Sequence, residues 1–208
     1  MAYIANTAFE VYVSNISRDN LQNITGKFGT GTGEGFTEDD CSAGFLCVRN
    51  GRLPLEGYSD ASLNNGNSRY MNAAATGASP AGFTASRNTG IYACNSYDVN
   101  KAGDGVLNFN FPGRTLGIKT PKGERGTFTE IMIGDQYNFG AGNFSTAPSG
   151  SNLYCKITNG LLVAQAAAPT DGSVYFQVMD MTKRFTDGPY DGGAKYTLMA
   201  LRSVAATE

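Results

Sequence analysis

Two segments of this chain, far apart in the sequence, share one pattern. Each has a short alternating run that begins at a cysteine, then an Asn-Gly pair, then a second run that contains leucine; the segments are Cys47–Leu53 and Cys155–Leu162. Asn-Gly is a strong hairpin signal, because a two-residue type I′ turn needs positive φ at both central positions. The sequence therefore predicts a tight β-hairpin at Asn50-Gly51 and another at Asn159-Gly160.

Short runs in which apolar and polar residues alternate fill the rest of the chain, separated by loops rich in Asn, Gly, Ser and Pro. Helix is expected in under about a tenth of the residues, because no segment of helical length has a 3.6-residue period and only 180–185 suits a single turn. We predict an all-β fold, a sandwich or barrel-like antiparallel arrangement with long Gly/Asn-rich loops. The predicted strands are 8–14, 44–49, 52–55, 69–74, 90–96, 105–111, 114–118, 126–133, 136–139, 153–158, 161–166, 174–179 and 195–202.

The N-terminal part, residues 1–40, is predicted to be one strand followed by a Gly-rich arm, and residues 41–208 a β-rich body. Residues 15–40 lack apolar periodicity and contain alternate glycines, so we expect a loose, extended arm. Whether the two Asn-Gly segments of the body reflect a duplication or a hairpin that recurs by chance stays open.

A long segment that cannot bury itself is a candidate for contact with a partner, most simply by adding a strand to a neighbour's sheet edge. The expected contact residues of the arm are Phe28, Gly31, Gly33 and Phe36. The charged turn at residues 121–126 adds Lys122 and Arg125 as further contact candidates.

Composition narrows the classes of partner. The net charge of −2, with 16 scattered Lys and Arg, argues against a nucleic-acid binder. No apolar run is long enough to cross a bilayer, so we expect no membrane partner. The first residues do not form a secretory signal, so we expect a protein made in a cytosol, with its thiols reduced. The four cysteines are expected to be reduced, with Cys47, Cys94 and Cys155 as small buried hydrophobes in strand-like runs; a Cys41–Cys47 disulfide is the less favoured alternative.

The chain has no histidine, which excludes a Ser-His-Asp or Cys-His catalytic arrangement. A carboxylate pair for glycoside hydrolysis stays formally open. Glu130 is the most interesting candidate, because it shares a strand face with Phe128 and Met132; it is either desolvated or, as we favour, a partly exposed or Arg-paired acid. We predict no catalytic, cofactor or metal site. The carboxylate candidates are Glu130, Asp135, Asp98 and Asp104.

Aromatic residues gather in the middle of the chain and could form a sugar-binding platform. Their period-two spacing is more typical of one face of a core, and there is no tryptophan to strengthen a lectin-like interpretation. The aromatic set is Tyr92, Tyr97, Phe109, Phe111, Tyr137, Phe139 and Phe144.

The stretch from Leu153 through the Asn-Gly pair to Pro169, and on to Leu201, carries a strand, an Asn-Gly turn, a Leu-Val strand and a small-residue loop. With the segment Gly123–Asp135, it resembles virion proteins of tailed bacteriophages, in particular small capsid decoration (cement) proteins. The resemblance implies an accessory protein that binds the major capsid protein lattice on the capsid exterior after synthesis in the host cytoplasm, as a homo-oligomer with a trimer favoured. Deletion of residues 18–38 should leave the β core folded while it weakens assembly or capsid binding.

Three hypotheses follow. The first is a structural virion protein that stabilises the outer capsid surface. The second is a carbohydrate- or receptor-binding β module of a phage fibre or adhesin. The third, least favoured, is a hydrolase with paired carboxylates.

Overall fold

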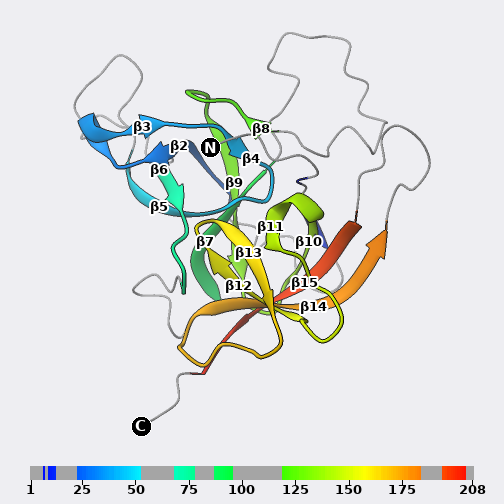
Figure 1. Ribbon diagram of the computed structural model, residues 1–208. Helices are drawn as coiled ribbons and strands as arrows, with labels where there is room; N and C mark the ends of the chain where they lie inside the picture. Colours follow the sequence, from blue (N-terminus) through cyan, green and yellow to red (C-terminus); the bar gives the residue numbers. More distant parts are fainter. Residues whose placement is uncertain are drawn as a thin grey trace.

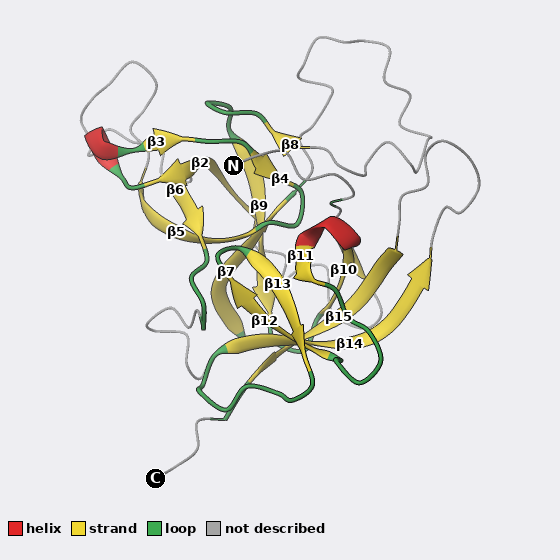
Figure 2. Ribbon diagram, in the orientation of Figure 1, coloured by secondary structure: helices red, strands yellow, loops and turns green. Residues whose placement is uncertain are grey.

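The computed structural model describes residues 7, 9–12, 23–52, 68–77, 87–95, 119–183 and 194–204. Strands dominate this part of the chain and form mainly antiparallel sheets, which confirms the predicted all-β fold (Figure 1). Helix among the described residues is limited to two 3-10 turns, η2 (Gly33–Gly35) and η6 (Ala141–Asn143), drawn in red in Figure 2.

One group of strands closes into a barrel. Each of five strands pairs with two others in the group, because β2 bonds both β6 and β9 and so joins the two ends of the sheet. All of these pairings are antiparallel except β2–β6. The barrel strands are β2 (Asn23–Thr30), β5 (Leu46–Arg52), β6 (Ser68–Ala73), β7 (Asn88–Cys94) and β9 (Gly126–Met132).

One short strand extends the barrel sheet, and two others form a small sheet of their own. Strand β3 (Thr37–Glu38) pairs with the end of β2, while β4 (Cys41–Ser42) pairs with β8 (Lys119–Thr120).

A seven-stranded sheet packs against the barrel. Its strand order is β1-β10-β15-β14-β12-β13-β11, and only the β11–β13 pair is parallel. The strands are β1 (Phe9–Tyr12), β10 (Gln136–Gly140), β11 (Phe144–Thr146), β12 (Tyr154–Thr158), β13 (Leu161–Gln165), β14 (Val174–Lys183) and β15 (Ala194–Arg202).

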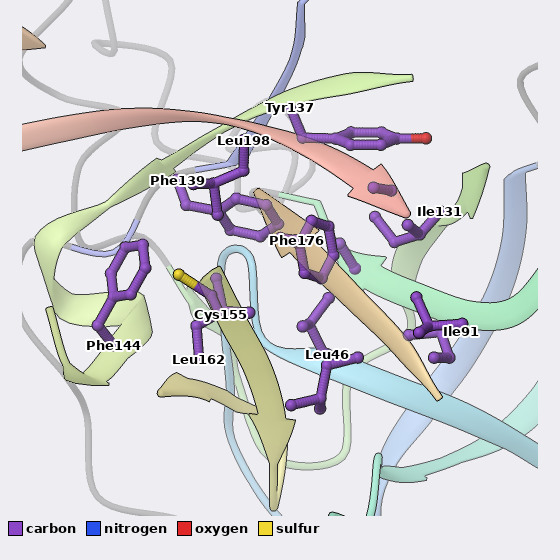
Figure 3. Packing of buried hydrophobic residues seen from close by; sticks show 14 of the residues in the cluster. Leu46, Ile91, Ile131, Tyr137, Phe139, Phe144, Cys155, Leu162, Phe176 and Leu198 are labelled. Atoms are coloured by element: carbon purple, nitrogen blue, oxygen red, sulfur yellow. The ribbon is translucent and has the colours of Figure 1, made fainter. Parts of the chain in front are cut away.

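The two-residue period of the barrel strands divides their side chains between two cores. On β7, Tyr92 and Cys94 belong to a cluster inside the barrel, whereas Ile91 and Ala93 belong to a second cluster outside it. The outer cluster joins the barrel wall to the inner face of the seven-stranded sheet, where Phe176 and other large side chains are fully buried (Figure 3). One face of the large sheet is thus buried against the barrel, and its other face points away from it.

The two Asn-Gly pairs have different structures. Asn159 and Gly160 have φ of 48° and 80° and connect β12 to β13, whose register pairs Thr158 with Leu161. This hairpin confirms the prediction.

The hairpin predicted at Asn50-Gly51 is wrong, because both residues lie within β5. The antiparallel partner of this strand is β6, and the register shift between Arg49 and Arg52 marks a bulge at which Gly51 has φ of 74°. A positive φ was correctly indicated at this glycine, but the backbone uses it to bend a strand and not to reverse the chain.

The expectation of a loose arm over residues 15–40 is wrong for residues 23–40; residues 15–22 lie outside the described part. Strand β2 is hydrogen-bonded on both sides, and Phe28 is buried inside the barrel. The glycines of β2 reflect close packing, since a Cβ on Gly26 would lie 2.5 Å from the carbonyl oxygen of Arg69. Removing this segment would take a strand out of the barrel, so we no longer expect the body to fold without it.

Two further predictions concern the ends of strands. The helical turn considered at residues 180–185 is wrong over its described part, because β14 continues as a strand to Lys183. The strands predicted at 105–111 and 114–118, and most of that at 52–55, lie outside the described residues.

Candidate functional site

One buried carboxylate faces the interior of the barrel. Glu130 is 1% exposed and pairs in register with Tyr92, which belongs to the interior cluster. Its Oε2 accepts a hydrogen bond from Nδ2 of Asn88 at 2.9 Å, and its Oε1 accepts one from the backbone N–H of Gly90 at 3.0 Å. Because the β7–β9 register shifts here, the carboxylate satisfies a backbone donor in an irregular stretch of β7. The favoured prediction of a partly exposed acid is therefore wrong, and Glu130 has a structural role.

The pKa of the Tyr92 phenol depends on its burial and on nearby charges. Burial, and then the charge of Glu130, raise the pKa of Tyr92, while the guanidinium groups of Arg49 and Arg69 oppose the shift.

The second described carboxylate candidate, Asp135, lies between β9 and β10. Its Oδ1 accepts a hydrogen bond from Nη2 of Arg87 at 2.5 Å. Burial raises the pKa of Asp135, and the Arg87 charge acts against that rise. Glu130 and Asp135 are each engaged in hydrogen bonds of the fold, and Asp98 and Asp104 lie outside the described residues.

The four thiols are free and fully buried, which confirms the predicted burial of Cys47, Cys94 and Cys155 and extends it to Cys41. Cys41, Cys47 and Cys94 lie together inside the barrel, and Cys155 lies in the outer cluster. Burial, followed by a hydrogen bond with Cys47, raises the pKa of Cys41; a hydrogen bond with Cys41, followed by burial, raises the pKa of Cys94. Burial raises the pKa of Cys155 to about 12. These thiols stay protonated at neutral pH, which makes them poor nucleophiles.

The structure separates the four predicted contact residues of the N-terminal segment. Phe28 is buried inside the barrel, so its side chain is not available to a partner. Gly31 and Gly33 are exposed at the tip that joins β2 to β3. Phe36 is half-buried, with its ring centroid 4.7 Å from that of Tyr70. The part of this segment that is exposed to a partner is therefore residues 30–35, which we call the tip of the β2–β3 hairpin.

Lys122 lies beside the base of this hairpin, whereas Arg125 is half-buried in the same turn. The backbone N–H of Lys122 donates to Oδ1 of Asp40 at 2.8 Å, and Nζ of Lys119 donates to Oδ2 at 2.7 Å. These two hydrogen bonds, the Lys119 bond first, lower the pKa of Asp40. Asp40 thus ties the turn that carries exposed Lys122 to the chain just after β3.

A second surface, which we call the outer face, is the side of the seven-stranded sheet that points away from the barrel. Two rows of side chains cross it in register, and all of these residues are half-buried. The first row is Gln136, Met199, Gln177, Tyr154 and Gln165, and the second is Leu201, Tyr175, Lys156 and Val163.

Sequence reasoning did not single out the outer face. The signal was present in the alternation of β12, where Tyr154 and Lys156 take the opposite face from buried Cys155 and Ile157. The composition of a row, however, depends on which strands are neighbours. Conversely, Tyr92, Tyr137, Phe139 and Phe144 of the predicted aromatic set are buried, which confirms their assignment to cores; Tyr97, Phe109 and Phe111 lie outside the described residues.

Comparisons with protein-family models, with curated proteins and with solved structures find no match to this chain. No helix among the described residues is long and apolar enough to span a membrane. Within the same residues, no group of three or more His, Cys, Asp or Glu side chains is arranged to hold a metal ion.

Proposed function

We propose that this protein is a non-catalytic structural component of a virus particle, which binds and stabilises the outer capsid surface as a decoration protein. The proposal starts from the resemblance of the segments around residues 123–135 and 153–201 to tailed-phage virion proteins. The partner is then the major capsid protein lattice, and the protein acts as a homo-oligomer, with a trimer favoured.

The observation that best supports the proposal is the exposed β2–β3 tip, carried on a closed barrel. The ends of the tip are fixed by backbone pairing of Gly29 with Glu38 and of Thr30 with Thr37. An ion pair between Lys27 and Glu38, with N and O 2.9 Å apart, holds the same two strands together. A short exposed loop on a pre-organised hairpin loses little conformational entropy on docking. Many copies on one lattice would add the further strength of multivalent binding.

Co-sedimentation with capsids tests this proposal. The full chain is mixed with capsids assembled from the major capsid protein of the same genome, and bound protein is quantified against added protein. We expect saturable binding that Lys122→Gln weakens, because Lys122 is exposed beside the base of the hairpin that carries the tip. Lys156→Gln is the matched control, since it removes a lysine charge from the outer face, away from the barrel. Absence of saturable binding contradicts the proposal. Equal loss in the two variants contradicts the tip as the contact.

A carbohydrate- or receptor-binding module of a fibre or adhesin is the second candidate. The observation that favours it is the outer face, where Tyr154 and Tyr175 remain half-exposed beside glutamine side chains. Native mass spectrometry and a glycan-binding measurement on the isolated protein separate this function from capsid binding.

A further inference from the structure

In the two rows of the outer face, Lys156 is the one charged side chain, among polar, apolar and aromatic groups. Lys156 lies on the central strand β12, directly opposite Tyr175 on β14 and Val163 on β13. Neither of the two rows contains Asp or Glu. Within the described part of the chain, the Lys156 ammonium takes part in no hydrogen bond or ion pair. The charge of this half-buried lysine is therefore available to an anionic ligand.

Two tyrosines adjoin this lysine. The ring centroids of Tyr154 and Tyr175 are 6.2 Å apart, and the ring planes are tilted by 56°. Burial, and then the neighbouring Tyr154, raise the pKa of Tyr175, so its phenol stays protonated at neutral pH and can donate a hydrogen bond. Tilted tyrosines offer both an apolar ring surface and a hydroxyl group, which suits a ligand with an apolar face and polar edges.

Planar amides complete the surface. Gln177 lies directly opposite Tyr154 on one side, and Gln165 lies opposite it on the other. The Nε2 of Gln165 already donates to the carbonyl oxygen of Ala167 at 2.7 Å, which orients this amide. A glutamine amide both donates and accepts, as a vicinal pair of sugar hydroxyls does.

From these placements we propose that the outer face binds a carboxylated glycan, with Lys156 paired to the sugar carboxylate. The ring of the sugar packs on Tyr154 and Tyr175, and the amide of Gln177 bonds its hydroxyl groups. The amides and the lysine charge, placed beside two tyrosine rings, suit the hydroxyl groups, the carboxylate and the ring of such a sugar. The site is independent of the proposed capsid contact, because it lies on the side of the sheet that faces away from the barrel.

Binding of trigalacturonate, measured by isothermal titration calorimetry on the full chain, tests the proposal. We expect Lys156→Gln to weaken binding by about tenfold or more, as loss of a charge-assisted hydrogen bond implies. Lys122→Gln, which removes a lysine charge on the barrel, should leave affinity unchanged. Both variants should melt at the wild-type temperature, since each residue is on the surface.

Two further probes identify the chemistry. The methyl ester of trigalacturonate keeps the sugar and removes the charge, so we expect it to bind the wild-type protein as weakly as the acid binds Lys156→Gln. Tyr154→Ala should weaken the acid and the ester alike. The proposal is overturned if trigalacturonate does not bind at millimolar concentration, or if Lys156→Gln binds it normally. It is also overturned if a poly-glutamate peptide competes equally well, because the occupant would then be an acidic protein segment. Capsid co-sedimentation of Lys156→Gln reports separately on the decoration function.

Discussion

Gly160 joins the two parts of the fold, and its replacement by alanine gives a sharp test of how they dock. The backbone N–H of Gly160 donates to the carbonyl oxygen of Ala74 at 2.9 Å, and its own carbonyl oxygen accepts from the N–H of Leu46 at 2.9 Å. A Cβ at this position would meet three atoms of the Phe45 ring, the farthest of them 2.7 Å away. Phe45 is 1% exposed and packs in the interior cluster of the barrel, so its ring cannot simply move aside.

The expected cost has two parts. The positive φ of 80° costs a residue with a Cβ about 1–2 kcal/mol. Overpacking against a buried ring adds about 1–3 kcal/mol. Gly160→Ala should therefore lower the free energy of unfolding by roughly 2–5 kcal/mol, and the melting temperature by roughly 5–15 °C for a chain of this size.

Gly134→Ala is the matched control. Gly134 has a similar φ of 88°, but a Cβ there would have no atom within 4 Å. Its replacement should cost only the conformational part, about 1–2 kcal/mol. The measurement is urea unfolding followed by fluorescence and circular dichroism, with the slope compared between variants.

A double-mutant cycle with Phe45→Leu isolates the steric term. Leucine removes the ring that the new Cβ would strike, so the two changes together should destabilise the protein less than the sum of the two alone, by about 1 kcal/mol or more. Equal losses at Gly160 and Gly134, or strict additivity with Phe45→Leu, would refute the reasoning that the hairpin turn is fitted against the barrel.

Three further outcomes are expected. Glu130→Ala should destabilise the fold by about 1–3 kcal/mol in urea unfolding, because it leaves the backbone N–H of Gly90 without its acceptor. Glu130→Gln keeps an acceptor oxygen and should cost less; equal losses in the two variants would contradict the role of Glu130 as an acceptor for Gly90. The four buried thiols, including Cys155, should not react with a thiol reagent at pH 8 until the protein is unfolded, and rapid reaction of the folded protein would contradict their burial. The lowered pKa of Asp40 implies a contribution to folding stability that is present above the unfolded pKa and is lost as pH falls through the folded pKa. In pH-dependent melting this contribution should be less than about 1 kcal/mol, and Lys119→Gln or high salt should remove it. An Asp40 carboxyl whose pKa is found unshifted by NMR would contradict it.

Local sequence pattern alone determined the all-β class and most described strands. A two-residue period is a property of neighbours in the chain, and it does not depend on the rest of the fold. The Asn159-Gly160 turn was predictable for the same reason, because both residues adopt positive φ and the flanking strands pair with each other directly. Burial of Cys47, Cys94 and Cys155 also followed from their places in strand-like runs.

Tertiary structure decided which strands meet. The sequence predicted a loop at residues 23–30, because their glycines contribute no apolar side chains. In the structure, Gly26 lies so close to the backbone of β6 that a Cβ at this position would clash with it. Asn50-Gly51 has the same local signal as Asn159-Gly160. The strand that pairs with β5 is β6, which begins only at Ser68, so the chain does not reverse at Gly51; this glycine lies in a β-bulge instead. The outer face likewise exists only because β12 lies between β13 and β14, which brings Lys156 beside Tyr175. Strand pairing is a long-range choice set by burial on both faces of each strand, and no single segment of the sequence contains it.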